Sequence, residues 1–239
     1  MKNLWDDIAK DYDNISKVSQ AHHDKFDYVA KIISDLKPKT ILDIGCGSGL
    51  LEEFLIKKSY QGQIEALDFS KKMLGIAKVK IGDKPNITFN IWDLNDTLPY
   101  KEESFDCIVA INVIFFLAKP EKLINNLFFL LNENGYLILI NPKPKGSTKE
   151  FFKEQYKSKT FVEIVKEIFK DIISIKSLIK VLRVQRKLDN YNNKGRIKYQ
   201  DFNEIKDMLE SVGFIIERCE EIQAKQNWIF VVKKKASSE

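Results

Sequence analysis

The stretch "ILDIGCGSGLLEEFL", residues 41–55, is an apolar run that ends in three glycines at alternate positions and then continues as an apolar and acidic pattern. The glycines are Gly45, Gly47 and Gly49. The first half of the stretch predicts a short buried strand, and the second half predicts a helix. The side chains expected to face inward from this helix are Leu50, Leu51, Phe54 and Leu55. A strand, a glycine turn and a helix in this order offer backbone N–H groups and the positive end of a helix dipole to a ligand.

The spacing of the glycines excludes the usual dinucleotide fingerprint. That pattern, G-x-G-x-x-G, needs a glycine at its sixth position. Counting from Gly45 places Leu50 there, and counting from Gly47 places Glu52 there. A pyrophosphate would also lie unfavourably close to Glu52 and Glu53. The turn is therefore expected to hold a smaller ligand pressed against the backbone.

Strands alternate with helices along the next hundred residues. Further strands are expected over 63–70, 86–94, 104–117 and 135–142, with helices over 71–81 and 121–134, the latter stopped by Gly135. This alternation predicts an open parallel sheet with helices on both faces, which binds ligands at the carboxyl ends of its strands. After Pro142 the pattern becomes helical, and the chain closes with a helix over 201–213 and two strands, 214–222 and 227–234. Because a short link joins these strands, they should pair antiparallel.

Helices are also expected before the first strand. Residues 3–36 have helical spacing on either side of a polar break, "NISKVSQAHH" at 14–23, and Pro38 closes the segment. The chain should therefore fold as one domain, residues 1–239. Its expected parts are an N-terminal helical segment over 1–37, a ligand-binding core over 40–142, a basic helical insertion over 143–199, called the lid segment below, and a closing unit over 200–235.

The lid segment differs in charge from the rest of the chain. Residues 143–198 carry 16 Lys or Arg against 6 Asp or Glu, a net charge of +10, whereas the whole chain has +5. Apolar residues recur at steps of three and four, as in the seam of an amphipathic helix. They are Phe161, Val165, Ile168, Ile172, Ile175, Ile179 and Leu182. This pattern suits a pocket for an acyl or prenyl chain, an anionic carrier or a membrane surface, or a lid whose lysines simply face water.

Two acids at strand ends suggest what the glycine turn binds. Asp68 ends the second expected strand, where a carboxylate can accept hydrogen bonds from a ribose diol. Asp93 ends the third, between Trp92 and Leu94, where it can accept the exocyclic amine of an adenine held by apolar side chains. Together with the turn, these acids point to an adenosyl ligand.

With these motifs the chain resembles the class I S-adenosylmethionine-dependent methyltransferases of the small-molecule type, which include quinone-biosynthesis and carrier-protein methyltransferases. The resemblance rests on "ILDIGCGSGLL", "IEALDFSKKMLGIAK", "WDLNDTLPYKEESFDCIVAINVIFFL" and "LLNENGYLILINP", and more weakly on the closing helix and strands. It implies an α/β fold with a Rossmann-like, mostly parallel sheet of seven strands. In that fold the last strand is antiparallel, helices cap the N-terminal side, and a helical insertion precedes the sixth strand.

The resemblance also implies a set of contacts with S-adenosylmethionine, whose product is S-adenosylhomocysteine. The residues implied at the methionyl part are Asp43, Gly45, Cys46, Gly47 and Gly49. Asp68 is implied at the ribose, and the residues near the adenine are Phe69, Met73, Trp92, Asp93 and Leu94. Asn112 and Val113 are implied beside the sulfonium. Tyr12, in a segment that resembles the family's N-terminal cap, is a further expected contact.

One departure concerns the catalytic group. Many relatives have a pair of histidines shortly after the fourth strand, where this chain has Phe115 and Phe116. The general base is therefore unknown, with Tyr12, His22 and His23 as weak candidates. Because methyl transfer depends mainly on alignment, and a base adds only about 10²- to 10⁴-fold, activity is still expected. The departure favours an acceptor that is already nucleophilic, such as a carboxylate, thiolate or enolate.

The expected function is therefore methyl transfer to a small, acidic or lipid-like acceptor, which a carrier protein can hold. The alternatives are a protein that binds S-adenosylmethionine without transferase activity, or a methyltransferase of RNA or protein; no basic and aromatic motif favours nucleic acid. The three cysteines are scattered and predict neither disulfide nor metal. The acidic start and the lack of 18 consecutive apolar residues predict a cytoplasmic protein, with peripheral membrane contact through the lid left open.

Overall fold

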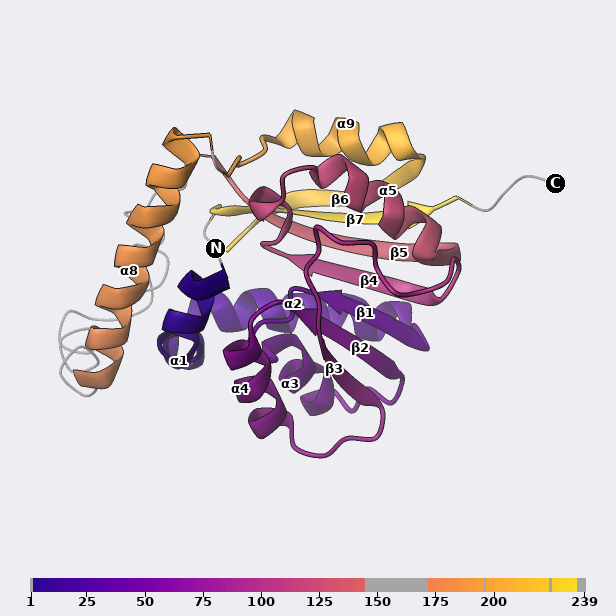
Figure 1. Ribbon diagram of the computed structural model, residues 1–239. Helices are drawn as coiled ribbons and strands as arrows, with labels where there is room; N and C mark the ends of the chain where they lie inside the picture. The colour runs from indigo at the N-terminus through magenta and orange to yellow at the C-terminus, as the bar shows by residue number, and fades with distance from the viewer. Residues whose placement is uncertain (1, 145–171, 196, 224, 236–239) are drawn as a thin grey trace.

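The computed structural model describes residues 2–144, 172–195, 197–223 and 225–235. Its centre is a seven-stranded sheet in the order β3-β2-β1-β4-β5-β7-β6, with helices on both faces (Figure 1). The strands are β1 Thr40–Ile44, β2 Gln63–Asp68, β3 Ile87–Ile91, β4 Phe105–Ile111, β5 Leu131–Pro142, β6 Phe214–Ile222 and β7 Asn227–Lys234. Strand β7 runs antiparallel to both β5 and β6, and the other adjacent strands pair in parallel. The predicted sheet and its antiparallel closing pair are confirmed.

The helices cover the sheet in two layers. They are α1 Lys2–Val18, α2 Gln20–Leu36, α3 Leu50–Lys57, α4 Lys71–Ile81, α5 Pro120–Leu130, α8 Ile172–Asn193 and α9 Phe202–Val212, with a 3₁₀ turn η1 at Ile114–Phe116. One apolar cluster joins α2, α3 and α4 to one face of the sheet, and a second joins α5 and α9 to the other. The order of the strands reverses between β1 and β4, and such a switch point opens a crevice at the carboxyl ends of the strands.

Several predicted boundaries were wrong. The strand expected over 104–117 ends at Ile111, because the backbone turns at Asn112 with a positive φ and Ile114–Phe116 form the 3₁₀ turn η1. The expected polar break at 14–23 is a single residue, because extended Ser19 separates α1 from α2 and its Oγ accepts a hydrogen bond from the His22 N–H at 3.4 Å. The helix expected to run to Gly135 ends at Leu130. There Glu103 N and Ser104 N donate to the carbonyls of residues 129 and 130, and the chain continues directly as β5.

The described part of the lid segment contains the helix α8, but the predicted apolar seam is interrupted there at Ile179. Phe161, Val165 and Ile168 lie outside the described residues. On α8, Ile179 is 45% exposed, whereas Val184 and Leu188 are buried. The reason is that α8 packs mainly on α1 rather than on the sheet, as Figure 1 shows. Within the described part of the chain, no helix is long and apolar enough to cross a membrane.

Candidate active site

A cavity of about 590 Å³ lies at the carboxyl ends of the strands. Its walls come from the glycine loop, the ends of β2 and β4, the segment after β3, and the turn η1. Helices α1 and α8 contribute residues from the other side. The cavity is therefore enclosed by segments from both ends of the chain and from its middle.

The glycine loop is held against β2 by its own backbone. The N–H groups of Gly45 and Cys46 both donate to the carbonyl of Leu67, at 2.7 and 2.9 Å. Gly47 has a positive φ of 57° and lines the cavity, and a Cβ built on it would meet no protein atom within 4 Å. Gly47 therefore leaves room for a ligand to approach the backbone closely.

Gly49 serves a different purpose in the same loop. It has a φ of 76°, and a Cβ there would lie 2.9 Å from Cβ of Ala77 and 3.2 Å from its Cα. The glycine permits α3 to begin directly against α4. Gly49 is thus a packing residue, and it does not line the cavity.

Asp68 is fixed in the cavity wall by the glycine loop and by the start of α4. Its Oδ2 accepts a hydrogen bond from Gly47 N at 3.0 Å, and its Oδ1 accepts one from Ser70 N at 2.8 Å. Burial raises the pKa of this carboxyl, and the two N–H donors partly oppose the rise. Each oxygen has further lone pairs, so the carboxylate can still accept hydrogen bonds from a ligand.

Tyr12 reaches the same part of the cavity from the cap helix α1. Burial, and second the charge of Asp68, raise the pKa of Tyr12 to about 12. The phenol therefore stays protonated at neutral pH and is a hydrogen-bond donor, not a base.

Asp93 lines the cavity from the segment after β3. Its Oδ1 accepts hydrogen bonds from the backbone N and the side-chain Nδ2 of Asn95, at 3.0 and 2.8 Å, which fixes a tight turn. Phe69, Met73 and Leu94 also line the cavity. These apolar side chains and the Asp93 carboxylate form the kind of slot that a flat heterocycle with an amine needs.

The end of β4 forms the boundary between this part of the cavity and the next. Asn112 and Val113 both line it. Asn112 has a φ of 57°, a left-handed conformation that is uncommon outside glycine and is concentrated at functional sites. Its N–H donates to the carbonyl of Ile140 at 2.7 Å, which holds the strained residue in place.

Other predicted residues lie outside the lining of the cavity. They are Asp43, Cys46, Gly49, Trp92 and His23. Asp43 and Glu52 are buried beneath the loop; burial raises the pKa of Asp43 well above its usual range and that of Glu52 to about 7. Burial also raises the pKa of the Cys46 thiol, and Trp92 packs against the second apolar cluster. Contact of these residues with a ligand stays a prediction.

The two histidines have different surroundings. His22 lines the cavity, with Nδ1 3.2 Å from Oγ of Ser19, whereas His23 lies edge-on to the ring of Phe54. Burial, followed by the charges of Lys25 and His23, lowers the pKa of His22 to about 3. His22 is therefore neutral at physiological pH and a weak base.

Lys25, one turn after His22, is a buried cation whose removal should stabilise the protein. The residue is 2% exposed, its Nζ has no polar partner among the described residues, and burial lowers its pKa to about 7. Between about pH 7 and 10.5 the Lys25 amine is protonated in the unfolded chain but neutral in the folded protein. The loss of folding stability caused by burying Lys25 is therefore greatest at and below pH 7 and vanishes near pH 10.5. Each pKa unit corresponds to about 1.4 kcal/mol.

We expect Lys25→Met to raise the free energy of unfolding by several kcal/mol at pH 7, and by less at pH 9. Urea denaturation at both pH values measures the change. Lys31→Met, an exposed lysine on the same helix, is the matched control and should change little. An equal gain in the free energy of unfolding at both pH values would contradict the lowered pKa of Lys25.

Residues that the sequence interpretation did not assign complete the lining of the cavity, and those of the third apolar cluster form its far end beneath α1 and α8. The unassigned residues are Trp5, Ile8, Asn95, Ile111, Leu117, Pro142, Val184, Leu188, Tyr199, Gln223 and Asn227. Phe115 and Phe116, which stand where many relatives have histidines, lie there too. The helical spacing of Trp5, Ile8 and Tyr12 indicates an apolar face. This face covers a cavity only because the distant helix α8 packs on α1, and no local sequence pattern indicates that contact.

The fold is that of the class I S-adenosylmethionine-dependent methyltransferases. Residues 42–139 match the family model described as a methyltransferase domain, which assigns this part of the chain to that class. It is 32% identical over 127 residues to malonyl-[acyl-carrier protein] O-methyltransferase 1 of Ilyobacter polytropus, covering 53% of this chain and 46% of that protein. It is 28% identical over 170 residues to demethylmenaquinone methyltransferase of Thermotoga maritima, covering 70% and 72%. The chain thus matches about half the length of the first relative.

Two solved structures share the fold. Magnesium protoporphyrin IX methyltransferase from Synechocystis PCC 6803, with bound S-adenosylhomocysteine, superposes with a TM-score of 0.65 at 19% identity and covers 98% of each chain. The [4+2]-cyclase SpnF superposes with a TM-score of 0.59 at 13% identity, covering 88% of this chain and 81% of that one. At these identities the likeness concerns the fold alone.

Proposed function

We propose that this protein transfers a methyl group from S-adenosylmethionine to a lipid-like acceptor. The observation that carries the proposal is one continuous cavity with two chemically different ends. The Asp68 end is polar and suits an adenosyl group, whereas the end beneath α1 and α8 is apolar and aromatic.

The residues of the polar end fit S-adenosylmethionine. The space above Gly47 would be filled by a Cβ and admits a ligand against the backbone. Asp68 and Asp93 offer acceptors for hydroxyl and amine groups, and the Asn112 Oδ1 is a buried acceptor without a hydrogen-bond partner among the described residues. We infer that Asp68 holds the ribose, Asp93 and Leu94 the adenine, and Gly45, Gly47 and Asn112 the methionyl part.

The mechanism that the residues support is alignment without a strong base. When bound, S-adenosylmethionine supplies a methyl group on a positively charged sulfur, and the carbon–sulfur bond breaks as the bond to the acceptor forms. The roof of α1 and α8 excludes water and restricts the acceptor, and orientation of this kind can supply about 7–11 kcal/mol of the barrier. Because His22 is neutral and weakly basic and Tyr12 stays protonated, the acceptor should arrive already nucleophilic.

The far end of the cavity supports an apolar or aromatic acceptor. The rings of Phe115 and Tyr199 stack with centroids 4.9 Å apart, and Trp5 lies edge-on to Phe116 at 5.5 Å. Val184 and Leu188 of α8 are buried beside them. Among the described residues that line the cavity, none is Lys or Arg. A ring or chain gains from burial there, whereas a free carboxylate would lack a cationic partner from these residues.

A carrier-linked acidic acceptor is the second candidate. The exposed side chains of Arg183, Arg186 and Lys187 lie at helical spacing on α8, beside the roof of the cavity. Such a basic face suits an anionic carrier. The relative from Ilyobacter polytropus is named for a malonyl group on a carrier protein, and the relative from Thermotoga maritima for a demethylated menaquinone.

A transfer assay with two acceptors separates these candidates. The purified protein is incubated with methyl-labelled S-adenosylmethionine and either a short-chain demethylated naphthoquinol or a malonyl-carrier protein. We expect label on the quinol, and Phe116→Ala should raise the KM for the quinol by about 10- to 100-fold, the loss of about 1.5–3 kcal/mol of burial, with unchanged affinity for S-adenosylmethionine. Phe129→Ala, an exposed phenylalanine on α5, is the control. Label on the carrier alone would favour the second candidate, and binding without transfer to either would favour a binding protein.

A further inference from the structure

The cap helix α1 is attached to the cofactor half of the protein by polar contacts at two points along α4. Near one end of α1, Asp6 Oδ1 accepts a hydrogen bond from Ser70 Oγ at 2.5 Å. Near the other, Asp13 forms an ion pair with Lys80 at 2.6 Å. Between them runs an open groove of about 600 Å³, where Val79 of α4 is 87% exposed. In the described residues, the apolar clusters of α1 and α4 are separate.

The opposite face of α1 is held by apolar contacts. Ile8 belongs to a third buried cluster with Phe115, Val184 and Leu188, and Trp5 and Tyr12 pack against it. Asp11 adds an ion pair to Lys180 of α8 at 3.0 Å. The cap is thus joined to α8 by an apolar core and to the cofactor half by a few charged groups.

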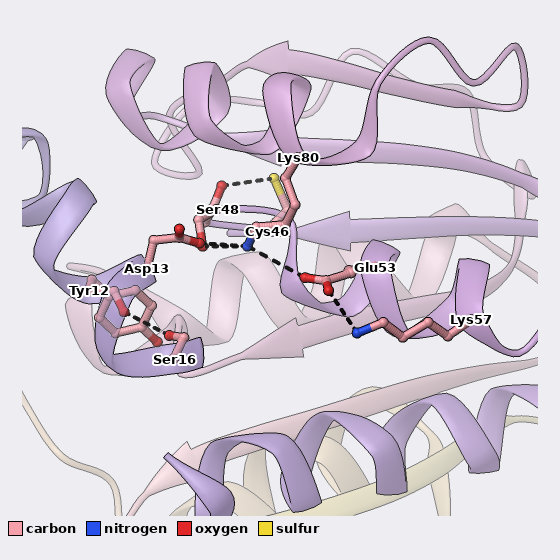
Figure 2. A network of polar contacts seen from close by, with 9 residues as sticks. Tyr12, Asp13, Ser16, Cys46, Ser48, Glu53, Lys57 and Lys80 are labelled. Carbon is pink, nitrogen blue, oxygen red and sulfur yellow. Dashed lines mark hydrogen bonds and ion pairs between the residues drawn. The ribbon is translucent and has the colours of Figure 1, made fainter. Parts of the chain in front are cut away.

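Lys80 is the central residue of the polar attachment, as Figure 2 shows. Its Nζ contacts Asp13 of α1, Ser48 of the glycine loop at 3.4 Å and Glu53 of α3 at 3.9 Å. The Lys80 side chain is 11% exposed and that of Asp13 is 6% exposed. A buried pair of this kind fixes the relative position of the elements that carry it, because separating its charges leaves one of them buried and unpaired.

We propose that Lys80 is a positioning residue that closes the cap over bound S-adenosylmethionine by tying Asp13 to the glycine loop. The inference rests on the proposed function for the identity of the ligand. Asp13 follows Tyr12 directly in α1, and Tyr12 lines the cavity close enough to Asp68 for that charge to raise its pKa. Fixing Asp13 therefore fixes Tyr12 over the cavity. Without Lys80, Asp13 loses this ion pair, and the cap loses its attachment to the loop through Lys80.

The test compares Lys80→Met with Lys57→Met. Lys57 belongs to the same network through Glu53 at 2.7 Å, but it is 58% exposed, and its contacts with Glu53 and the ring of Phe54 lie within α3. The first readout is the dissociation rate of S-adenosylhomocysteine in stopped flow, followed by tryptophan fluorescence, since Trp5 lies on the cap. We expect release about 10- to 100-fold faster in Lys80→Met, as for loss of a buried charged contact, and unchanged release in Lys57→Met.

The second readout is hydrogen exchange without any ligand. Amides of α1 should exchange at least about tenfold faster in Lys80→Met, while those of β1, β4 and α4 keep their protection. Asp13→Asn, which keeps the shape but removes the charge, should act in the same direction, and adding it to Lys80→Met should have little further effect.

The outcomes distinguish the two proposals. If the wild-type protein fails to bind S-adenosylhomocysteine, the proposed function is wrong, and exchange in α1 still decides whether Lys80 holds the cap. Unchanged α1 exchange and unchanged release in Lys80→Met would overturn the role of Lys80. Loss of protection throughout the sheet would overturn it too, because it would show a general structural role.

Discussion

Replacing Asp68 by alanine should lower the affinity for S-adenosylmethionine by about 100-fold or more. The carboxylate is the acceptor inferred for the ribose diol, and hydrogen bonds to a charged group contribute about 1.5–3 kcal/mol each. The substitution also removes the acceptor for the Gly47 N–H, so the loop should lose part of its order. Isothermal titration with S-adenosylmethionine measures the loss.

Two variants control this experiment. Asp68→Asn keeps one acceptor oxygen without the charge and should give an intermediate affinity. Asp96→Ala removes an exposed carboxylate from the segment after β3 that does not line the cavity, and it should bind like the wild-type protein. Equal affinity for S-adenosylmethionine in the wild-type protein and in folded Asp68→Ala would contradict the proposal that Asp68 holds the ribose.

Gly49→Ala and Gly47→Ala should separate folding from binding within one loop. At Gly49 the new Cβ meets Ala77 at 2.9 Å in a left-handed backbone conformation, so the free energy of unfolding should fall by about 2–5 kcal/mol. At Gly47 nothing opposes the Cβ, and only the backbone strain of about 1–2 kcal/mol applies. The Cβ would instead occupy ligand space and weaken binding by about 10- to 100-fold.

Denaturation and titration on both variants test this separation. Gly195→Ala, with a positive φ of 65° and no atom within 4 Å of its Cβ, provides the cost of the positive φ alone. Equal stability loss at Gly47 and Gly49 would mean that the contact with Ala77 relaxes freely.

The lining at the Asp68 end of the cavity could be predicted from the sequence because its residues follow from local patterns and one topological rule. Asp68 and Asp93 each end a strand, and the parallel order of β1, β2 and β3 brings those ends to one edge. The spacing of the three glycines does not indicate which residues of the loop face the cavity. Gly47 faces the cavity, whereas Gly49, two residues later, faces α4.

The errors and omissions have a common cause in contacts distant along the chain. The helix α5 ends at Leu130 because residues before β4 bond to its last carbonyls, which no helix propensity reveals. The acceptor end depends on α1 meeting α8, and these helices are separated by most of the chain. The exposure of Ile179 follows from the same contact, because α8 turns its buried side toward α1 rather than toward the sheet.

The separate apolar cluster between α1 and α8 has a consequence for how such a protein changes over evolutionary time. Ile8, Val184 and Leu188 belong to neither of the two clusters beside the sheet. Mutations at these positions alter the proposed acceptor end of the cavity and leave the two clusters beside the sheet unchanged, and distant sites of this kind have nearly additive effects on stability. A lineage can therefore drift toward new acceptors by small steps while its methyl donor stays the same.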